Sequence, residues 1–219
     1  MNIKRALIIA NGEPCSPFLL EKSQQTCSLT IVLDGAVHQI MQKKIAFDIL
    51  FGDFDRDEID FQKIKSYAPN AMIISAEDQD ETDFVKAINY LIEQHFDEVI
   101  ILWATGRRAD HAISNMTNIA RFRDKIAIRM CDDYSEISLL PILPKVFRKE
   151  YKAKTNISLI PIGTVEGITT KNLTYPLHHE TLKMGYRTGN SNEVHEDGMV
   201  EISYETGDLL LMECHDKID

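Results

Sequence analysis

Two aspartates separated by one residue follow a mostly apolar stretch at residues 46–51. The segment is Gly52-Asp53-Phe54-Asp55. Alternate residues of an extended chain share a face, so both carboxylates can point toward one side. Carboxylate oxygens suit Mg²⁺, which usually shares its coordination shell with substrate phosphates. Taken alone, the pattern indicates a magnesium site or, equally well, a solvated acidic turn.

A second acidic run, residues 78–83, places four carboxylates within six residues, directly before an amphipathic pattern. That pattern predicts a helix from Asp83 to His95. Acids favour a helix N-terminus, and Asp80 is expected to be the N-cap. Capping does not explain the whole run, because crowded carboxylates repel unless a cation joins them. We therefore expect Asp83 to bind metal or substrate.

A third polar cluster, residues 105–111, leaves an apolar run and enters a predicted helix. Gly106 and Arg108 could seat a phosphate group, because free helix N–H groups and a guanidinium both attract anions. Asp110 is expected either to cap the helix or to orient Arg108. His111 could act as a general base, although a histidine satisfied by local hydrogen bonds explains it as well.

Two weaker candidates complete the set. Asp34 and Gly35 follow another apolar run and could hold a ribose or adenine group, with glycine permitting close backbone approach. A tight strand–helix turn explains them equally well. Ser191 and Asn192 lie in a predicted glycine-rich loop and could hydrogen-bond a small ligand, although a plain turn would look the same.

Short apolar runs alternate with helical patterns over the first 122 residues. This alternation predicts an open, mainly parallel sheet with helices on both faces. Ligands of such sheets collect beyond the carboxyl ends of the strands, so the polar clusters, including the one at Asn11, should share one rim. The expected strands cover residues 6–10, 29–33, 46–51, 71–75 and 98–103, and the expected helices cover residues 36–42, 57–67, 83–95 and 110–122.

The pattern of the sequence changes after about residue 123. Short segments punctuated by turns replace the helical patterns, which is typical of a β-sandwich or small barrel. We therefore predict two domains: an α/β domain over residues 1–125 with an open mainly parallel sheet, and an all-β, sandwich-like domain over residues 126–219.

Composition narrows the function classes. The chain has 219 residues, 44% of them hydrophobic and 26% charged, as in an ordinary globular protein. Its net charge of −10 argues against general binding to nucleic acid or to an anionic membrane. The cysteines are scattered without a C-x-x-C pair, and the N-terminal apolar run is too short for a secretory signal. We expect a cytoplasmic protein with reduced thiols.

In this order the clusters resemble those of the thiamine pyrophosphokinase family. The resemblance spans nearly the whole chain, and it is the ordered set rather than any one motif that is specific. The matching pieces are Asn11-Gly12-Glu13, Asp34-Gly35-Ala36, Gly52-Asp53-Phe54-Asp55, Gln79-Asp80-x-Thr82-Asp83, Thr105-Gly106-x-Arg108-x-Asp110-His111 with Asn115, Ser158–Pro161, Gly167–Leu173, Tyr175–Leu177 and Ser191–Glu193.

The resemblance implies a cytoplasmic, Mg²⁺-dependent enzyme that converts ATP and thiamine to AMP and thiamine diphosphate. It also implies a homodimer with shared active sites, in which the β-domain contributes to thiamine binding and dimerisation. The implied roles are as follows: metal ligands Asp53, Asp55 and Asp83; catalytic residues Asp53, Asp83 and Arg108; ATP contacts Asn11, Asp34, Gly35, Gly106, Arg108 and Asp110; and thiamine contacts Gln79, Asp83, Ser191 and Asn192.

Some positions depart from the common family pattern, namely Ala36, His38, Arg56 and Arg107, and they bear on the nucleotide contacts more than on the metal ligands. Two other functions are alternatives to thiamine diphosphate synthesis. A related enzyme could move the diphosphate onto another hydroxymethyl heterocycle such as a pterin, and it would not need the loop around Ser191. A non-catalytic nucleotide-binding module would not need the acidic cluster.

Overall fold

The computed structural model describes residues 3–54, 59–76 and 80–215, which form two compact units. The first unit comprises residues 1–118 and 122–132, and the second comprises residues 119–121 and 133–219. The first unit extends past residue 125, where the sequence placed the boundary, because strand β6 (Ala127–Cys131) pairs in parallel with strand β5 (Glu98–Leu102).

The first unit is built on the parallel sheet that the continuous apolar runs predict, in the order β4-β3-β2-β1-β5-β6. Ile8 at its centre lies opposite Ile31 on one side and Ile101 on the other, and all three are fully buried. The remaining strands are β1 (Arg5–Ile9), β2 (Leu29–Leu33), β3 (Ile49–Gly52) and β4 (Met72–Ser75).

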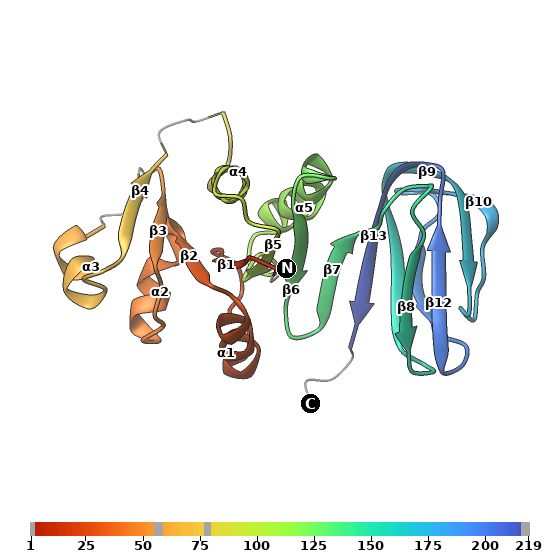
Figure 1. The fold of residues 1–219 in the computed structure, drawn as a ribbon, viewed down its shortest axis with the longest axis horizontal. Helices are drawn as coiled ribbons and strands as arrows, with labels where there is room; N and C mark the ends of the chain where they lie inside the picture. The colour runs from red at the N-terminus through yellow and green to blue at the C-terminus, as the bar shows by residue number, and fades with distance from the viewer. Residues whose placement is uncertain (1–2, 55–58, 77–79, 216–219) are drawn as a thin grey trace. The chain divides into compact units, whose positions relative to one another are not determined.

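Helices cover both faces of this sheet, and Figure 1 shows α1, α2 and α3 on one side with α4 and α5 on the other. The chain adds strands outward from β1 to β4 and then returns to place β5 on the other side of β1. In such sheets this reversal opens a ligand crevice at the carboxyl ends of the two central strands. The helices are α1 (Pro17–Thr26), α2 (Val37–Gln42), α3 (Phe61–Tyr67), α4 (Asp83–Glu93) and α5 (Ala109–Asn118), with 3-10 turns η1 (Asp34–Ala36) and η2 (Ile119–Phe122).

Helix α1 is absent from the sequence-based expectation. Its only local signal is Ser16 followed by Pro17: the Ser16 hydroxyl accepts a hydrogen bond from the Leu19 amide, and proline occupies the first turn. Its interior buries only Leu20 and Ser23, so it has no broad apolar face for a periodic pattern to reveal.

The second unit is all β, as predicted, and its described residues beyond η2 contain no helix. The long strand β9 (Asn156–Lys171) belongs to both sheets of the second unit. It pairs with β11 and β13 in one sheet and with β10 and β12 in the other. Strand β11 contains Ser191 and Asn192, which the sequence placed in a glycine-rich loop. The other strands are β7 (Ser135–Leu139), β8 (Phe147–Tyr151), β10 (His178–Lys183), β11 (Gly189–Glu193), β12 (Gly198–Ser203) and β13 (Thr206–Cys214).

Both units have closed apolar cores. In the first, alternate residues such as Leu7 and Ile9 pack against α1, α2 and α3 on one face of the sheet. In the second, β9 contributes Ile157, Leu159 and Val165 to a core between its sheets. Across the described residues, no helix is long and apolar enough to cross a membrane.

Candidate active site

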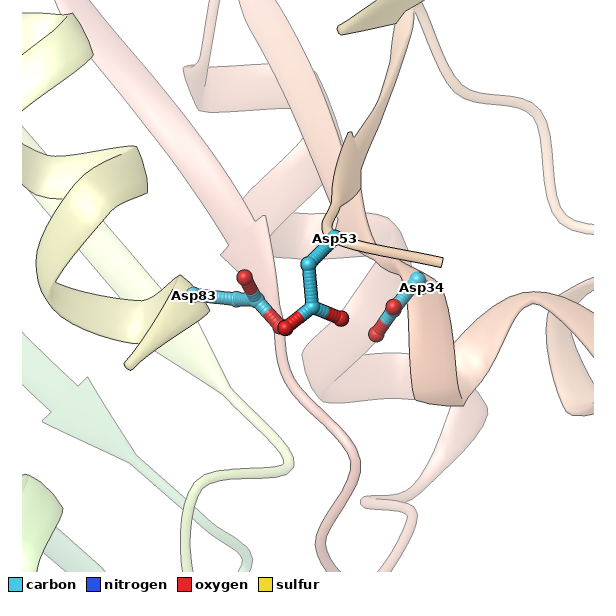
Figure 2. A group of neighbouring side chains, drawn as sticks. All are labelled: Asp34, Asp53 and Asp83. Atoms are coloured by element: carbon cyan, nitrogen blue, oxygen red, sulfur yellow. The ribbon is translucent and has the colours of Figure 1, made fainter. Parts of the chain in front are cut away.

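Three half-buried aspartates meet at the carboxyl-end rim of the first sheet. Asp34 follows β2, Asp53 follows β3 and Asp83 opens α4, and one carboxylate oxygen from each lies within 4.8 Å of the others. Figure 2 shows the three side chains converging from these separate elements. The structure thus brings Asp53 and Asp83 together and adds Asp34, which was expected on the ATP side. Asp55 lies outside the described residues.

Asp34 is held in this cluster by backbone groups. One of its oxygens accepts a hydrogen bond from the Gly35 amide at 2.5 Å, and the other accepts one from the Phe54 amide at 3.1 Å. Gly52 makes room for it, because a Cβ at that position would lie 2.5 Å from the Asp34 carboxyl carbon. The requirement for glycine comes from a neighbouring strand, so the local sequence around Asp34 does not reveal it.

The electrostatics of the cluster favour a bound cation. The pKa of Asp34 is raised, first by burial and then by the nearby Asp83, with a smaller contribution from Asp53, while the amides of Phe54 and Gly35 partly offset the rise. Ionising all three acids therefore carries an unfavourable charge–charge energy that a divalent cation would relieve. The all-oxygen donor set fits a hard cation such as Mg²⁺.

Asp83 is placed by the start of α4. The N-cap is Thr82, whose hydroxyl accepts a hydrogen bond from the Val85 amide, so the prediction of Asp80 as the cap is wrong. With Thr82 as the cap, Asp83 is the first helical residue and its carboxylate lies near the positive end of the helix dipole.

Removing this cap should loosen the first turn of α4. We expect Thr82→Ala to cost about 1 kcal/mol locally and so to speed hydrogen exchange of the first-turn amides by about fivefold. Thr82→Ser keeps the hydroxyl and should retain protection. Unchanged exchange in Thr82→Ala, measured by mass spectrometry, would show that the hydroxyl does not stabilise this turn.

The loops after β1 and β5 are joined closely at the sheet's reversal point. The Gly12 amide donates to the Trp103 carbonyl at 2.5 Å, and the Glu13 amide donates to the Thr105 carbonyl at 2.8 Å. Arg107 has a left-handed backbone (φ 50°), and its guanidinium donates to the Asn11 carbonyl at 3.2 Å and to the Asn11 side-chain oxygen at 2.9 Å.

A pocket of about 550 Å³ opens beside this junction. Arg107 forms part of the pocket wall and is hydrogen-bonded to Asn11, so the pocket lies beside this expected ATP contact. Its lining residues are Glu13, Pro14, Gln39, Gln42, Lys43 and Arg107.

Arg108 is exposed at the start of α5. It forms a two-point ion pair with Asp110, with nitrogen–oxygen distances of 3.1 and 2.5 Å. The hydrogen bond from Arg108 lowers the pKa of Asp110 to about 2. Asp110 was expected either to cap the helix or to orient Arg108, and the structure shows the second role.

The other residues of this cluster have separate environments. Gly106 has a left-handed backbone (φ 70°), and a Cβ added there would lie 2.6 Å from the Glu13 Cβ. His111 is exposed, whereas Asn115 is buried and donates to the Ala104 carbonyl at 3.0 Å. Asn115, from within α5, therefore holds the start of the loop that follows β5.

The expected thiamine contacts of the second unit lie on strand β11 rather than in a loop. Ser191 is exposed with φ 55°, at an irregularity in the pairing of β11 with β9. Asn192 is buried. Its side-chain NH₂ group donates to the Tyr175 carbonyl, and its side-chain oxygen accepts from the backbone amide of Tyr175. Asn192 therefore orders the chain at Tyr175 and leaves Ser191 as the accessible group. Gln79 lies outside the described residues.

Comparison with known proteins assigns the chain to a family. Residues 20–131 match the model of the thiamin pyrophosphokinase catalytic domain, and residues 145–209 match that of the thiamin pyrophosphokinase vitamin B1 binding domain. The first match alone covers half of the chain. The chain belongs to the thiamine pyrophosphokinase family.

Individual thiamine pyrophosphokinases agree with this. The Bacillus subtilis enzyme is 30% identical over 170 residues, covering 76% of this chain and 78% of its own. Thiamin pyrophosphokinase 1 of Caenorhabditis elegans is 27% identical over 199 residues, covering 84% of this chain and 79% of its own. A crystal structure of the Bacillus subtilis enzyme has a TM-score of 0.82 at 27% identity and covers 98% of this chain and all of the other.

The family confirms the predicted fold class, an α/β part joined to a β-rich part, and identifies the chain as an ATP-dependent diphosphotransferase. The two family-model matches follow the same order along the chain as the two kinds of architecture. Neither the pterin-type enzyme nor the non-catalytic nucleotide module is favoured.

Proposed function

We propose that the chain transfers the diphosphoryl group of ATP to the hydroxyl of thiamine, giving thiamine diphosphate and AMP. The observation that carries this proposal is the convergence of Asp34, Asp53 and Asp83 at the sheet rim of a thiamine pyrophosphokinase family member. Diphosphoryl transfer demands alignment and charge neutralisation more than covalent chemistry from the protein, and a rim of acids that binds a cation supplies both.

Asp34, Asp53 and Asp83 are the residues that would hold Mg²⁺, with Asp55 as a further proposed ligand. When bound, Mg²⁺ supplies positive charge that neutralises phosphate oxygens and orients them. Donor chemistry supports the assignment, since all contributed atoms are carboxylate oxygens and one of the acids has a raised pKa.

The bond changes define what the remaining residues must do. The thiamine hydroxyl oxygen forms a bond to the β-phosphorus, the bond between that phosphorus and the oxygen bridging to the α-phosphorus breaks, and AMP leaves. In our proposal Asp83 orients the hydroxyl and accepts its proton. Arg108 stabilises the charge that develops on AMP, which requires its guanidinium to contact phosphate as well as Asp110.

The rest of the ATP site is proposed around the joined loops. The proposed ATP contacts are Asn11, Asp34, Gly35, Gly106 and Asp110, because they follow strands β1, β2 and β5, and ligands of such sheets collect beyond the carboxyl ends of the strands. Ser191, Gln79 and Asn192 are proposed on the thiamine side, with Asn192 acting through the chain that it orders at Tyr175.

We further propose a cytoplasmic homodimer in which the β-rich part contributes to thiamine binding and to the dimer contact. Light scattering of the purified chain should give twice the mass of one chain, and a monomeric mass in active protein would contradict the dimer.

Release of AMP from ATP and Mg²⁺, with thiamine present or withheld, tests the function. We expect AMP only with thiamine, and in equal amount to thiamine diphosphate. AMP formation with a hydroxymethylpterin but not with thiamine would favour the pterin alternative. ATP binding without AMP from any acceptor would favour the non-catalytic module.

Metal binding should weaken as the pH falls. A proton competes with the cation for Asp34, and because the pKa of this acid is raised, the competition begins at a higher pH than for an ordinary aspartate. We expect the dissociation constant for Mg²⁺ to rise from neutral to mildly acidic pH. Asp34→Asn should bind more weakly at neutral pH and show a flatter pH dependence in calorimetric titrations; an equally steep dependence would mean that another group competes.

A further inference from the structure

A buried lysine stands one turn after Asp83 on α4. Lys86 is only 8% exposed, although lysine is almost never buried this fully unless it is paired. Its ammonium group lies 2.8 Å from a carboxylate oxygen of Asp83 and donates to the Ala76 carbonyl, just after β4, at 2.7 Å. Burying an ammonium costs several kcal/mol unless close partners offset it, so these contacts are needed for Lys86 to stay inside.

The ion pair restricts the Asp83 side chain. Asp83 and Lys86 are three residues apart on the same helix, so the contact needs no rearrangement of the backbone. The Asp83 side chain is 21% exposed. Its carboxylate also reaches the cluster with Asp34 and Asp53, as Figure 2 shows. A carboxylate tied on one side by an ammonium and presented on the other to two acids has few alternative rotamers.

We propose that Lys86 is a positioning residue, whose ion pair holds Asp83 in the orientation at which it joins Asp34 and Asp53 around a divalent cation. Its bond to the Ala76 carbonyl adds a second anchor, because it ties the end of β4 to the helix that carries Asp83. The inference rests on the proposed function only in assigning that cation to diphosphoryl transfer. Lys86 is not proposed to touch ATP or thiamine.

Positioning and simple charge have opposite consequences for metal affinity. Removing a positive charge from beside a cation site should strengthen cation binding if Lys86 acted only through its field. Removing the group that orients a ligand should weaken binding, and loss of such outer contacts typically costs 10-fold or more in metal affinity. The sign of the change therefore distinguishes the two roles.

The test is Mn²⁺ binding to the full chain without ATP or thiamine, followed by electron paramagnetic resonance of the free ion. We expect Lys86→Met to raise the Mn²⁺ dissociation constant about tenfold. Lys86→Arg keeps the charge and the donors and should retain most of the wild-type affinity. An unchanged or tighter dissociation constant in Lys86→Met would overturn the proposal.

A double-mutant cycle shows whether Lys86 acts through Asp83. Asp83→Asn should weaken Mn²⁺ binding, and adding Lys86→Met to it should change the affinity by less than about twofold, because the two residues act as a unit. Fully additive losses would overturn the proposal. Circular dichroism establishes that each variant folds; if Lys86→Met does not, the same cycle is run with Lys86→Gln, whose amide still donates hydrogen bonds but carries no charge.

Activity measurements separate this inference from the proposed function. In Lys86→Met the Mg²⁺ concentration for half-maximal AMP formation should rise, while the KM for thiamine stays unchanged. A wild-type chain that makes no AMP, yet binds Mn²⁺ with an affinity that depends on Lys86, would refute the function and leave the positioning role standing. Thiamine-dependent AMP formation with an unaltered Mn²⁺ affinity in Lys86→Met would refute the positioning role alone.

Discussion

Replacing Asp53 by asparagine is expected to lower the turnover number by about a thousandfold, because one preorganised charge is lost from the proposed metal site. Asparagine has nearly the same size, so the fold should be unaffected. Asp53 shares its cluster with Asp34 and Asp83, and an amide there can neither balance a cation nor replace the anionic ligand. Steady-state AMP formation with saturating thiamine and Mg²⁺ measures the effect.

The matched control is Glu93→Gln. Glu93 is exposed at the end of α4, so this change removes one negative charge from the same unit but at the far end of the helix from Asp83. Its turnover should equal that of the wild type. Near-normal turnover in Asp53→Asn, with folding verified by circular dichroism, would remove Asp53 from the proposed metal site.

Gly52→Ala should disable the site without removing any functional group. The added Cβ would lie 2.5 Å from the Asp34 carboxyl carbon and 2.6 Å from one of its oxygens. Asp34 cannot simply turn aside, because amides of Gly35 and Phe54 hold both of its oxygens. A displacement of about 1 Å in a catalytic group can cost about a hundredfold in rate, and we expect a loss of that size in turnover together with weaker Mg²⁺ binding.

Gly163→Ala provides the comparison. Gly163 has φ 76°, so alanine is strained there, but no atom lies within 4 Å of the added Cβ. This variant should lose stability and keep its turnover, whereas Gly52→Ala should lose turnover. Equal turnover in Gly52→Ala and the wild type would mean that Asp34 does not need its observed position.

Strands β1 to β5 of the parallel sheet could be predicted from the sequence because each is a mostly apolar run followed by polar residues. Strand β6 contains Arg129 and was assigned to the second domain. Burial on both faces removes the alternation of an exposed sheet, and the fully buried β5 shows this most clearly. Helix α4 was predictable for the complementary reason, since its apolar residues line one face and its first turn is acidic.

The details that position the site depend on contacts between strands and were not predictable locally. The approach of Asp34 to Gly52 is set by the pairing of β2 with β3, residues far apart in sequence. Likewise, the polar sequence of β11 predicted a loop, whereas the structure pairs this segment with β9 despite the positive φ of Ser191. The cap of α4 was misplaced because acids and Thr82 compete for the same position, and only the backbone geometry decides between them.

A crystal structure with Mg²⁺ and a non-hydrolysable ATP analogue would test the central claim most directly. We predict a metal ion about 2.1 Å from carboxylate oxygens of residues in the Asp34, Asp53 and Asp83 cluster, with its remaining ligands from water and the analogue's phosphates. A metal held by the phosphates alone, with these three carboxylates turned away from it, would contradict the account.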